Sequence, residues 1–152
     1  MSVSACVQEI ESFCNRWKHP VFGFCHIFLG SEGAAEESTS LAFVDYFREH
    51  DRAFDMDALP PALLEAAFCA VRKRCHAVRK TSGFKETLEE AVLVLPCNQR
   101  AVFILRTVLG LDAEVASKIM GLSSGEIVTT WMAALLRLRT LLPKRFFKEK
   151  GK

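Results

Sequence analysis

Cysteine and histidine are the side chains of this sequence with the widest chemistry, because they can ligate metals, act as nucleophiles or pair as disulfides. The nearest groupings for a zinc site lie around Cys25 and around Cys75, and neither has the two closely spaced ligand pairs that such a site requires. We therefore expect no metal and no cofactor, and reduced cysteines that pack as small core residues. A metal or redox role of the cysteines is the lesser alternative. These cysteines are Cys6, Cys14, Cys25, Cys69, Cys75 and Cys97.

The arrangement of the other reactive residues argues against an enzyme. The four histidines are scattered, without a Ser-His-Asp or Cys-His order, and the sequence holds no glycine-rich phosphate loop. The adjacent Glu89 and Glu90 are typical of a solvated helix face rather than of an acid–base pair.

Basic side chains gather in two segments of an otherwise acidic chain. The formal net charge is only +2, but residues 1–71 hold 4 Lys and Arg against 11 Asp and Glu. Residues 72–80 hold 5 basic residues and no acidic ones, and residues 137–152 hold 7 against 1. Such clusters displace counterions from nucleic acid, so they favour contact with phosphate. Solvated helix ends and a tail are the alternative interpretation.

Length and composition limit the elements that could position these residues. The chain has 152 residues, half of them apolar and a quarter charged, which suits one ordinary domain or two very small ones and excludes wholesale disorder. Its longest apolar stretch, residues 21–29, is too short to span a bilayer, and no secretory signal opens the sequence. We expect a cytoplasmic protein with no membrane partner.

Apolar residues recur at spacings of three and four, with almost no strand-type alternation, which predicts an all-α fold. Ser4 is expected to cap the first helix and Pro20 to begin the second. The turn-forming residues 81–83 predict a linker, residues 81–87, between a helical domain of residues 1–80 and another of residues 88–152. The expected helices cover residues 4–17, 20–29, 34–50, 60–71, 85–94, 99–109, 112–120 and 123–142.

Three local signals predict a helix-turn-helix unit in the second domain. Asp112 is expected to cap a short helix, and Gly121 to make a tight turn after it. Ser123 and Glu126 have the spacing of a capping box that opens a longer helix. This pattern is typical of DNA-binding domains, although any two antiparallel helices can produce it.

Short motifs follow one another in a consistent order over nearly the whole chain. In the N-terminal part they are Val21-Phe22-Gly23-Phe24, Phe28-Leu29-Gly30, Ala35-Glu36-Glu37 and Tyr46-Phe47. In the C-terminal part they are Leu95-Pro96, Arg100-Ala101-Val102-Phe103, Gly110-Leu111, Gly121-Leu122-Ser123 and Leu138-Arg139. In this order the sequence resembles bacterial sigma factors, especially the small extracytoplasmic-function (ECF) group. The resemblance implies a region-2-like helical bundle followed by a region-4-like helix-turn-helix domain.

The resemblance also implies partners and contact residues. It implies a subunit that binds core RNA polymerase and recruits it to promoter DNA, the first domain reading the −10 element and the second the −35 element. The polymerase would be contacted by Glu36, Glu37, Ser40 and Phe43. The residues that would contact DNA, mostly through phosphate, are Arg72, Lys73, Arg74, Arg79, Lys80, Ser124, Thr129, Thr130, Arg137 and Arg139.

The helix that should read DNA departs from the family pattern, because it has no basic residue before Arg137. Readout of base edges needs donors such as Arg, Asn or Gln, and only Thr129 and Thr130 are candidates here. An apolar outer face favours a protein-binding surface, and burial of this helix against the first domain is the alternative. The helical period places Val128, Met132 and Leu135 on that outer face, and Ile127, Trp131, Ala134 and Leu138 toward the core.

Two functions of different classes therefore remain open. The first is a divergent ECF sigma factor, whose weak or indirect DNA readout is helped by Arg137, Arg139 and the basic residues 144–152. The second is a sigma-like regulator that keeps the fold but binds an anti-sigma factor, or another protein, in place of promoter DNA. The apolar residues 66–70, where the family has polar and basic ones, favour the second. An unrelated helical adaptor is a third interpretation.

Overall fold

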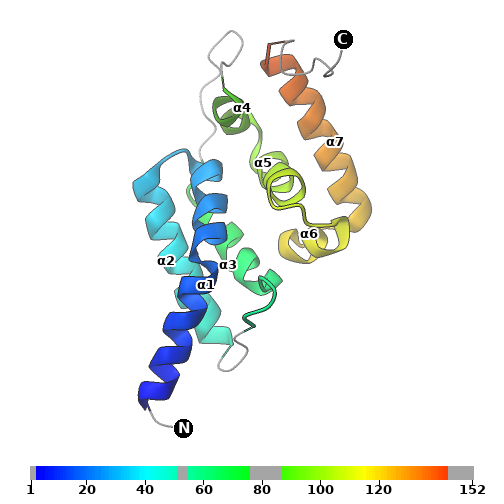
Figure 1. The fold of residues 1–152 in the computed structure, drawn as a ribbon. Coiled ribbons are helices and arrows are strands. Elements are labelled where there is room, and N and C mark those ends of the chain that lie inside the picture. Colours follow the sequence, from blue (N-terminus) through cyan, green and yellow to red (C-terminus); the bar gives the residue numbers. More distant parts are fainter. Residues whose placement is uncertain (1–2, 51–54, 76–86, 144–152) are drawn as a thin grey trace, which may run out of the picture.

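A computed structural model describes residues 3–50, 55–75 and 87–143 (Figure 1). These residues form an all-helical fold and contain no strand. No single helix among them is long and apolar enough to cross a membrane. Taken together, α6 and α7 are long and apolar enough, but the pair is bent by 97°. The helices are α1 (Val3–Leu29), α2 (Glu32–Glu49), α3 (Pro61–Arg72), α4 (Leu88–Val94), α5 (Cys97–Phe103), the π-helical turn η1 (Ile104–Val108), α6 (Ala113–Met120) and α7 (Ser124–Leu141).

The first two helices expected from the sequence form one continuous helix, α1, so the predicted break at Pro20 is wrong. Helix α1 starts at Val3, before the expected cap Ser4, and contains Pro20 in its interior. Proline removes one backbone N–H from the helix, which costs free energy. The same apolar stripe is buried on both sides of Pro20, through Phe13 before it and Phe24 after it, and this burial favours continuing the helix.

Other helix boundaries depend on local capping. Helix α2 begins earlier than expected because the Ser31 hydroxyl accepts a hydrogen bond from the Ala34 N–H at 3.3 Å. Helix α4 begins at Leu88, where Thr87 caps it, and not near Lys85. The expected helix 99–109 begins earlier, at Cys97, and changes to π-helical geometry at Ile104. The predicted starts of α3, α6 and α7 are confirmed within one residue.

The helices form two groups that share one core. Helices α1, α2 and α3, the N-terminal lobe, pack on one another, and α4 to α7 with η1 form the C-terminal lobe. The lobes meet where α3 packs on α6 and where α1 packs on α4 and η1. Buried side chains of both lobes form one continuous hydrophobic cluster. The division into domains of residues 1–80 and 88–152 therefore remains a prediction.

A buried arginine joins the two lobes. The Arg100 guanidinium on α5, only 2% exposed, donates to the Phe28 carbonyl at the end of α1 at 2.7 Å. It also donates to the carbonyls of Leu93 at 2.7 Å and Leu95 at 3.1 Å. Burial lowers the pKa of Arg100 because the charged form loses hydration. Beside it, Gly30 has a φ of 70° and lies against the Leu93 side chain, where a Cβ would be only 2.7 Å from a methyl carbon.

The lobes are also joined covalently, so the expectation that all cysteines are reduced is wrong. Cys75, just after α3, forms a disulfide with Cys97, the first residue of α5, across a sequence separation of 22. Their Cα atoms are 6.4 Å apart. The pairing follows from the packing of the lobes, which brings the ends of α3 and α5 together. Cys14, Cys25 and Cys69 are free thiols.

Candidate functional site

One face of α2 carries three of the residues implied to bind polymerase. Glu36, Glu37 and Ser40 are exposed and line a shallow depression together with Leu41, which is 48% exposed. Val44 is exposed one turn further on. This face, residues 36, 37, 40, 41 and 44, is called the α2 face below. Its mixture of carboxylates and exposed apolar side chains suits contact with another protein.

Phe43 does not belong to the α2 face. Its side chain is 8% exposed and packs edge-on against Phe13, with ring centroids 6.1 Å apart and planes at 84°. The structure places Phe43 on the buried stripe of α2, beside Ala42 and Tyr46. A direct polymerase contact through Phe43 is therefore not supported by its position, and its role there is to pack α2 on α1.

The basic residues at the end of α3 and just after it are only partly available to a ligand. Arg72 and Lys73 are exposed, and the Arg72 guanidinium lies 5.5 Å from the centroid of the Phe68 ring. Arg74 forms an ion pair with Glu37, so one cation of this segment is directed at the α2 face. Arg79 and Lys80 lie outside the described residues.

The helix-turn-helix geometry forms as the sequence predicts. The Asp112 carboxylate accepts from the Val115 N–H at 2.8 Å, and Gly121 takes the left-handed conformation with φ of 70°. The Ser123 hydroxyl accepts from the Glu126 N–H at 3.1 Å and so caps α7. These contacts fix the angle between α6 and α7.

The exposed surface of α7 is apolar where a DNA-reading helix would carry basic residues. Val128, Met132, Leu135 and Leu136 are exposed, and Met132 is 54% exposed. Ile127, Ala134 and Leu138 are buried, as the period predicts, whereas Trp131 is only half-buried. The indole N–H of Trp131 donates to the Thr107 hydroxyl at 3.0 Å.

Three of these residues line a groove of about 370 Å³, the α7 groove. Met132, Leu135 and Leu136 line it together with Arg139 of the same helix. The remaining residues that line it are Leu88, Phe103, Leu138 and Leu142. Sequence reasoning missed Leu136, although it lies one turn after Met132, and it missed Leu88 and Phe103 because they come from other helices.

The residues predicted to read DNA are spread along α7. Ser124 and Thr129 are exposed, Thr130 is half-buried, and Glu126 presents a carboxylate in the first turn. Arg137 is half-buried and Arg139 is exposed, both in the last turns of the helix. The first three turns thus offer hydroxyl groups and one negative charge to a nucleic acid, and positive charge appears only beyond them.

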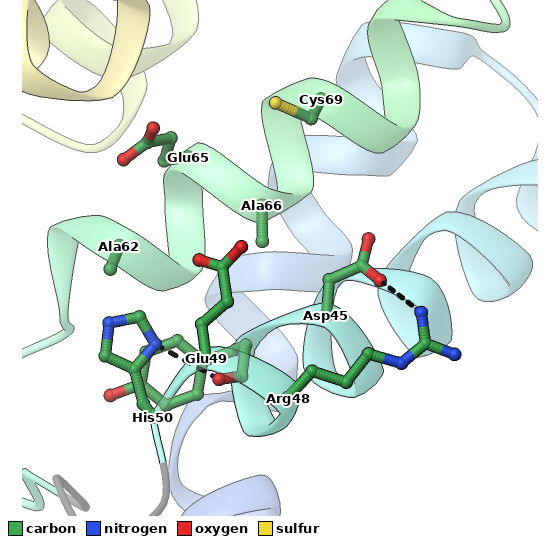
Figure 2. A pocket seen from close by; sticks show the side chains of 9 residues that line it. Asp45, Arg48, Glu49, His50, Ala62, Glu65, Ala66 and Cys69 are labelled. Atoms are coloured by element: carbon green, nitrogen blue, oxygen red, sulfur yellow. Dashed lines mark hydrogen bonds and ion pairs between the residues drawn. The ribbon is translucent and has the colours of Figure 1, made fainter.

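A second pocket, of about 390 Å³, lies between α2 and α3 (Figure 2). The His50 ring stacks on Tyr46 at 4.4 Å, and Arg48 pairs with Asp45 at 3.5 Å. Burial and the nearby Asp55 carboxylate raise the pKa of Tyr46. The other residues that line the pocket are Glu49, Ala62, Glu65, Ala66 and Cys69.

Within residues 3–50, 55–75 and 87–143, no group of three His, Cys, Asp or Glu side chains could hold a metal ion.

The thiols of the N-terminal lobe are in unlike environments. Burial raises the pKa of Cys25 to about 11, although a hydrogen bond with Thr39 acts in the opposite direction. Burial also raises the pKa of Cys14. Since the thiolate is the nucleophile, Cys25 is expected to be unreactive at neutral pH. Cys69 is exposed on α3.

Comparison with known proteins identifies the fold. No protein-family model matches the chain, and no curated protein does. Among solved structures the chain is similar to the sigma factor RpoE of Bartonella quintana, crystallised in complex with the anti-sigma factor NepR. The TM-score is 0.62 at 21% sequence identity, over 80% of this chain and 89% of that one. The chain therefore has the fold of a sigma factor, across both of its lobes.

Proposed function

We propose that this protein is a divergent sigma factor of the ECF type, which acts in transcription initiation. The observation that carries the proposal is the sigma-factor fold, which extends over both lobes and agrees with the order of the motifs in the sequence. On this proposal the α2 face binds core RNA polymerase. The sequence resemblance implies polymerase contact by Glu36, Glu37 and Ser40, and all three side chains are exposed on this face.

DNA binding on this proposal is weak and depends mainly on phosphate contacts. Arg72, Lys73 and Arg139 are exposed and can neutralise phosphates. Of the two threonines that could contact a base edge, Thr129 is exposed and Thr130 is half-buried, so Thr129 is the better placed. With so few donors, the second lobe contributes affinity and little sequence selectivity.

The test of the proposal is binding to core RNA polymerase followed by run-off transcription. The full chain is expected to bind purified core polymerase and to direct transcripts from fragments of its own genome. Glu36→Lys, on the α2 face, is expected to weaken polymerase binding at least tenfold. Glu49→Lys makes the same charge change on the same helix, but at the pocket of Figure 2, and is expected to change binding less than twofold. Absence of binding, or equal effects of both variants, would contradict the proposal.

The α7 groove favours a second candidate function, that of a regulator that binds an anti-sigma factor. Exposed Met132 and Leu136 beside Arg139 suit an amphipathic helix with apolar anchors and an acidic flank. The similar sigma factor was itself crystallised with an anti-sigma factor. In this function the fold competes for that partner and does not need to read a promoter.

Titration calorimetry with anti-sigma proteins from the source genome separates the two candidates. Met132→Lys is expected to weaken such a complex at least tenfold while leaving the melting temperature within a few degrees, because Met132 is 54% exposed. Val108→Lys, at an exposed site of η1 outside the groove, is the matched control and is expected to bind normally. Anti-sigma binding without polymerase binding would select the regulator, whereas promoter-specific transcripts would select the sigma factor.

A further inference from the structure

The Cys75–Cys97 disulfide has a position that neither candidate function uses. Each lobe supplies one cysteine, and both side chains are half-buried at the junction between the lobes. The chain that connects the lobes, residues 76–86, lies inside the loop that the disulfide closes. The disulfide holds the Cα atoms of Cys75 and Cys97 at 6.4 Å.

The junction is also closed by non-covalent contacts, which a short tether strengthens. Arg100 donates to the Phe28 carbonyl, Leu93 packs on Gly30, and α3 packs on α6. Joining two surfaces by a short link raises their effective concentration, so that the contacts between them form more often. Breaking the link lowers that concentration without removing any of these contacts.

We propose that Cys75 and Cys97 are a thiol–disulfide switch, which a low-molecular-weight disulfide of the glutathione type oxidises and which thereby ties the two lobes together. In the reduced protein the lobes separate more readily along the contact between α3 and α6. This inference concerns the chemistry and motion of the chain itself, so it does not depend on whether the protein is a sigma factor or a regulator.

The oxidation proceeds by two thiol–disulfide exchanges. The Cys75 thiolate attacks one sulfur of oxidised glutathione, the glutathione S–S bond breaks, and one glutathione thiolate leaves. The Cys97 thiolate then attacks the Cys75 sulfur of the mixed disulfide and releases the second glutathione thiolate. The two protons lost by the cysteines are taken up by the two glutathiones. The protein thus loses two electrons, which reduce one glutathione disulfide, and an excess of reduced glutathione reverses both steps.

The surroundings favour reaction at Cys75 over reaction at the buried thiol Cys25. Exposed Arg72 and Lys73 lie three and two residues before Cys75 and can attract the carboxylates of glutathione. Cys25 is buried, and its raised pKa keeps it in the unreactive thiol form. Cys69 lies on α3, six residues before Cys75, and is exposed but free, so it provides a matched control.

The experiment equilibrates the full chain in glutathione buffers from reducing to oxidising and follows two signals. Tryptic digestion without reductant is expected to give the peptide of residues 75–79 linked to that of residues 86–100, in oxidising buffer only. Hydrogen exchange of the α3 and α6 backbone amides is expected to slow at least tenfold when this linked peptide forms. Cys69→Ser should behave as the wild type in both measurements. Cys75→Ser and Cys97→Ser should exchange rapidly in every buffer.

Two results would overturn the switch. One is that the linked peptide does not form in oxidising buffer. The other is that it forms while the exchange of α3 and α6 stays the same as in the reduced protein, which would make the disulfide a passive cross-link. Comparison of the oxidised and reduced wild type needs no substitution, so the inference can be tested even where a cysteine variant folds poorly.

Discussion

At the scale of single residues, Arg100 is the polar group on which the junction of the lobes depends most. Its three backbone acceptors, the carbonyls of Phe28, Leu93 and Leu95, come from the ends of two different helices. Carbonyls at helix ends have no partner within their own helix, and a buried one that is left unpaired destabilises the fold. One guanidinium satisfies all three because its donors are arranged in a rigid fork.

Arg100→Met is therefore expected to lower the free energy of unfolding by about 3 kcal/mol, since it leaves buried carbonyls unpaired. Arg100→Lys should recover only part of this, because a single ammonium cannot reach all three acceptors in the same geometry. Urea unfolding followed by circular dichroism measures both. Arg48→Met removes an exposed ion pair with Asp45 and should cost less than about 1 kcal/mol. Equal losses at positions 100 and 48 would contradict this account of the junction.

Cys25 makes the stability depend on pH in the alkaline range. Its pKa is raised to about 11 in the folded protein, from 9.0 in the unfolded chain. Between these values the unfolded chain loses the thiol proton and the folded protein keeps it, so the unfolded state binds fewer protons and the free energy of unfolding falls as pH rises. Below pH 9 this loss is absent, and by about pH 11 it amounts to roughly 3 kcal/mol.

Urea unfolding at pH 8 and pH 10.5, with reductant throughout, tests this dependence on Cys25. Other groups titrate in the same range, Cys14 and Tyr46 among them, so the comparison is with Cys25→Ala. The variant is expected to start from a lower stability at pH 8 and to lose less between the two pH values. Parallel losses in the two proteins would show that Cys25 does not account for the alkaline destabilisation.

At the scale of elements, the capping of α7 determines where this helix begins. The Ser123 hydroxyl satisfies the Glu126 N–H, one of the free donors of the first turn. Ser123→Ala is expected to lower the free energy of unfolding by about 1 kcal/mol. Ser124→Ala, one residue later and inside the helix, should be neutral or slightly stabilising because alanine favours helices. Thermal denaturation of the two variants gives the comparison, and a larger loss at position 124 would refute the cap.

Local rules placed three element starts correctly, although the equally local caps Ser31 of α2 and Thr87 of α4 were missed. Asp112, Ser123 and Pro61 act through bonds or dihedral angles within one turn, so the sequence alone places α6, α7 and α3. The continuation of α1 through Pro20 was not predictable in this way, because burial against α2 and α3 outweighs the lost hydrogen bond. The π-helical turn after Phe103 had no local signal either.

The residues of the candidate sites were also predictable only where a pattern within one helix places them. The exposed face of α7 follows from its helical period, and so Met132 was expected at the surface. The wall of the α7 groove formed by Leu88 and Phe103 depends on how α4 and α5 pack, which no spacing within α7 encodes. The Cys75–Cys97 pair likewise depends on contact between lobes, since a separation of 22 residues fits many arrangements.

At the scale of the whole molecule, the question is whether the two lobes behave as one cooperative unit. The hydrophobic cluster runs through both of them, and the disulfide closes the loop between them. Cross-linking a loop of this length stabilises a fold by about 3 kcal/mol in the chain-entropy account. The oxidised protein is therefore expected to unfold in a single transition.

The two tryptophans report on one lobe each and make this testable. Trp17 on α1 donates to the Asp55 carbonyl at 2.8 Å, and Trp131 on α7 donates to Thr107. Trp131→Phe leaves only Trp17, so urea unfolding followed by fluorescence then reports on the N-terminal lobe. Trp17→Phe leaves only Trp131, which reports on the C-terminal lobe.

In the oxidised protein the unfolding midpoint of each variant by fluorescence should coincide with its midpoint by circular dichroism, because the lobes share a core. In the reduced protein the Trp131 signal should change at lower urea, since three fully buried phenylalanine rings, Phe13, Phe24 and Phe28, stabilise the N-terminal lobe. Separate midpoints in the oxidised protein would mean that each lobe is stable by itself, and that the contacts of Arg100 and of α3 with α6 do not couple them.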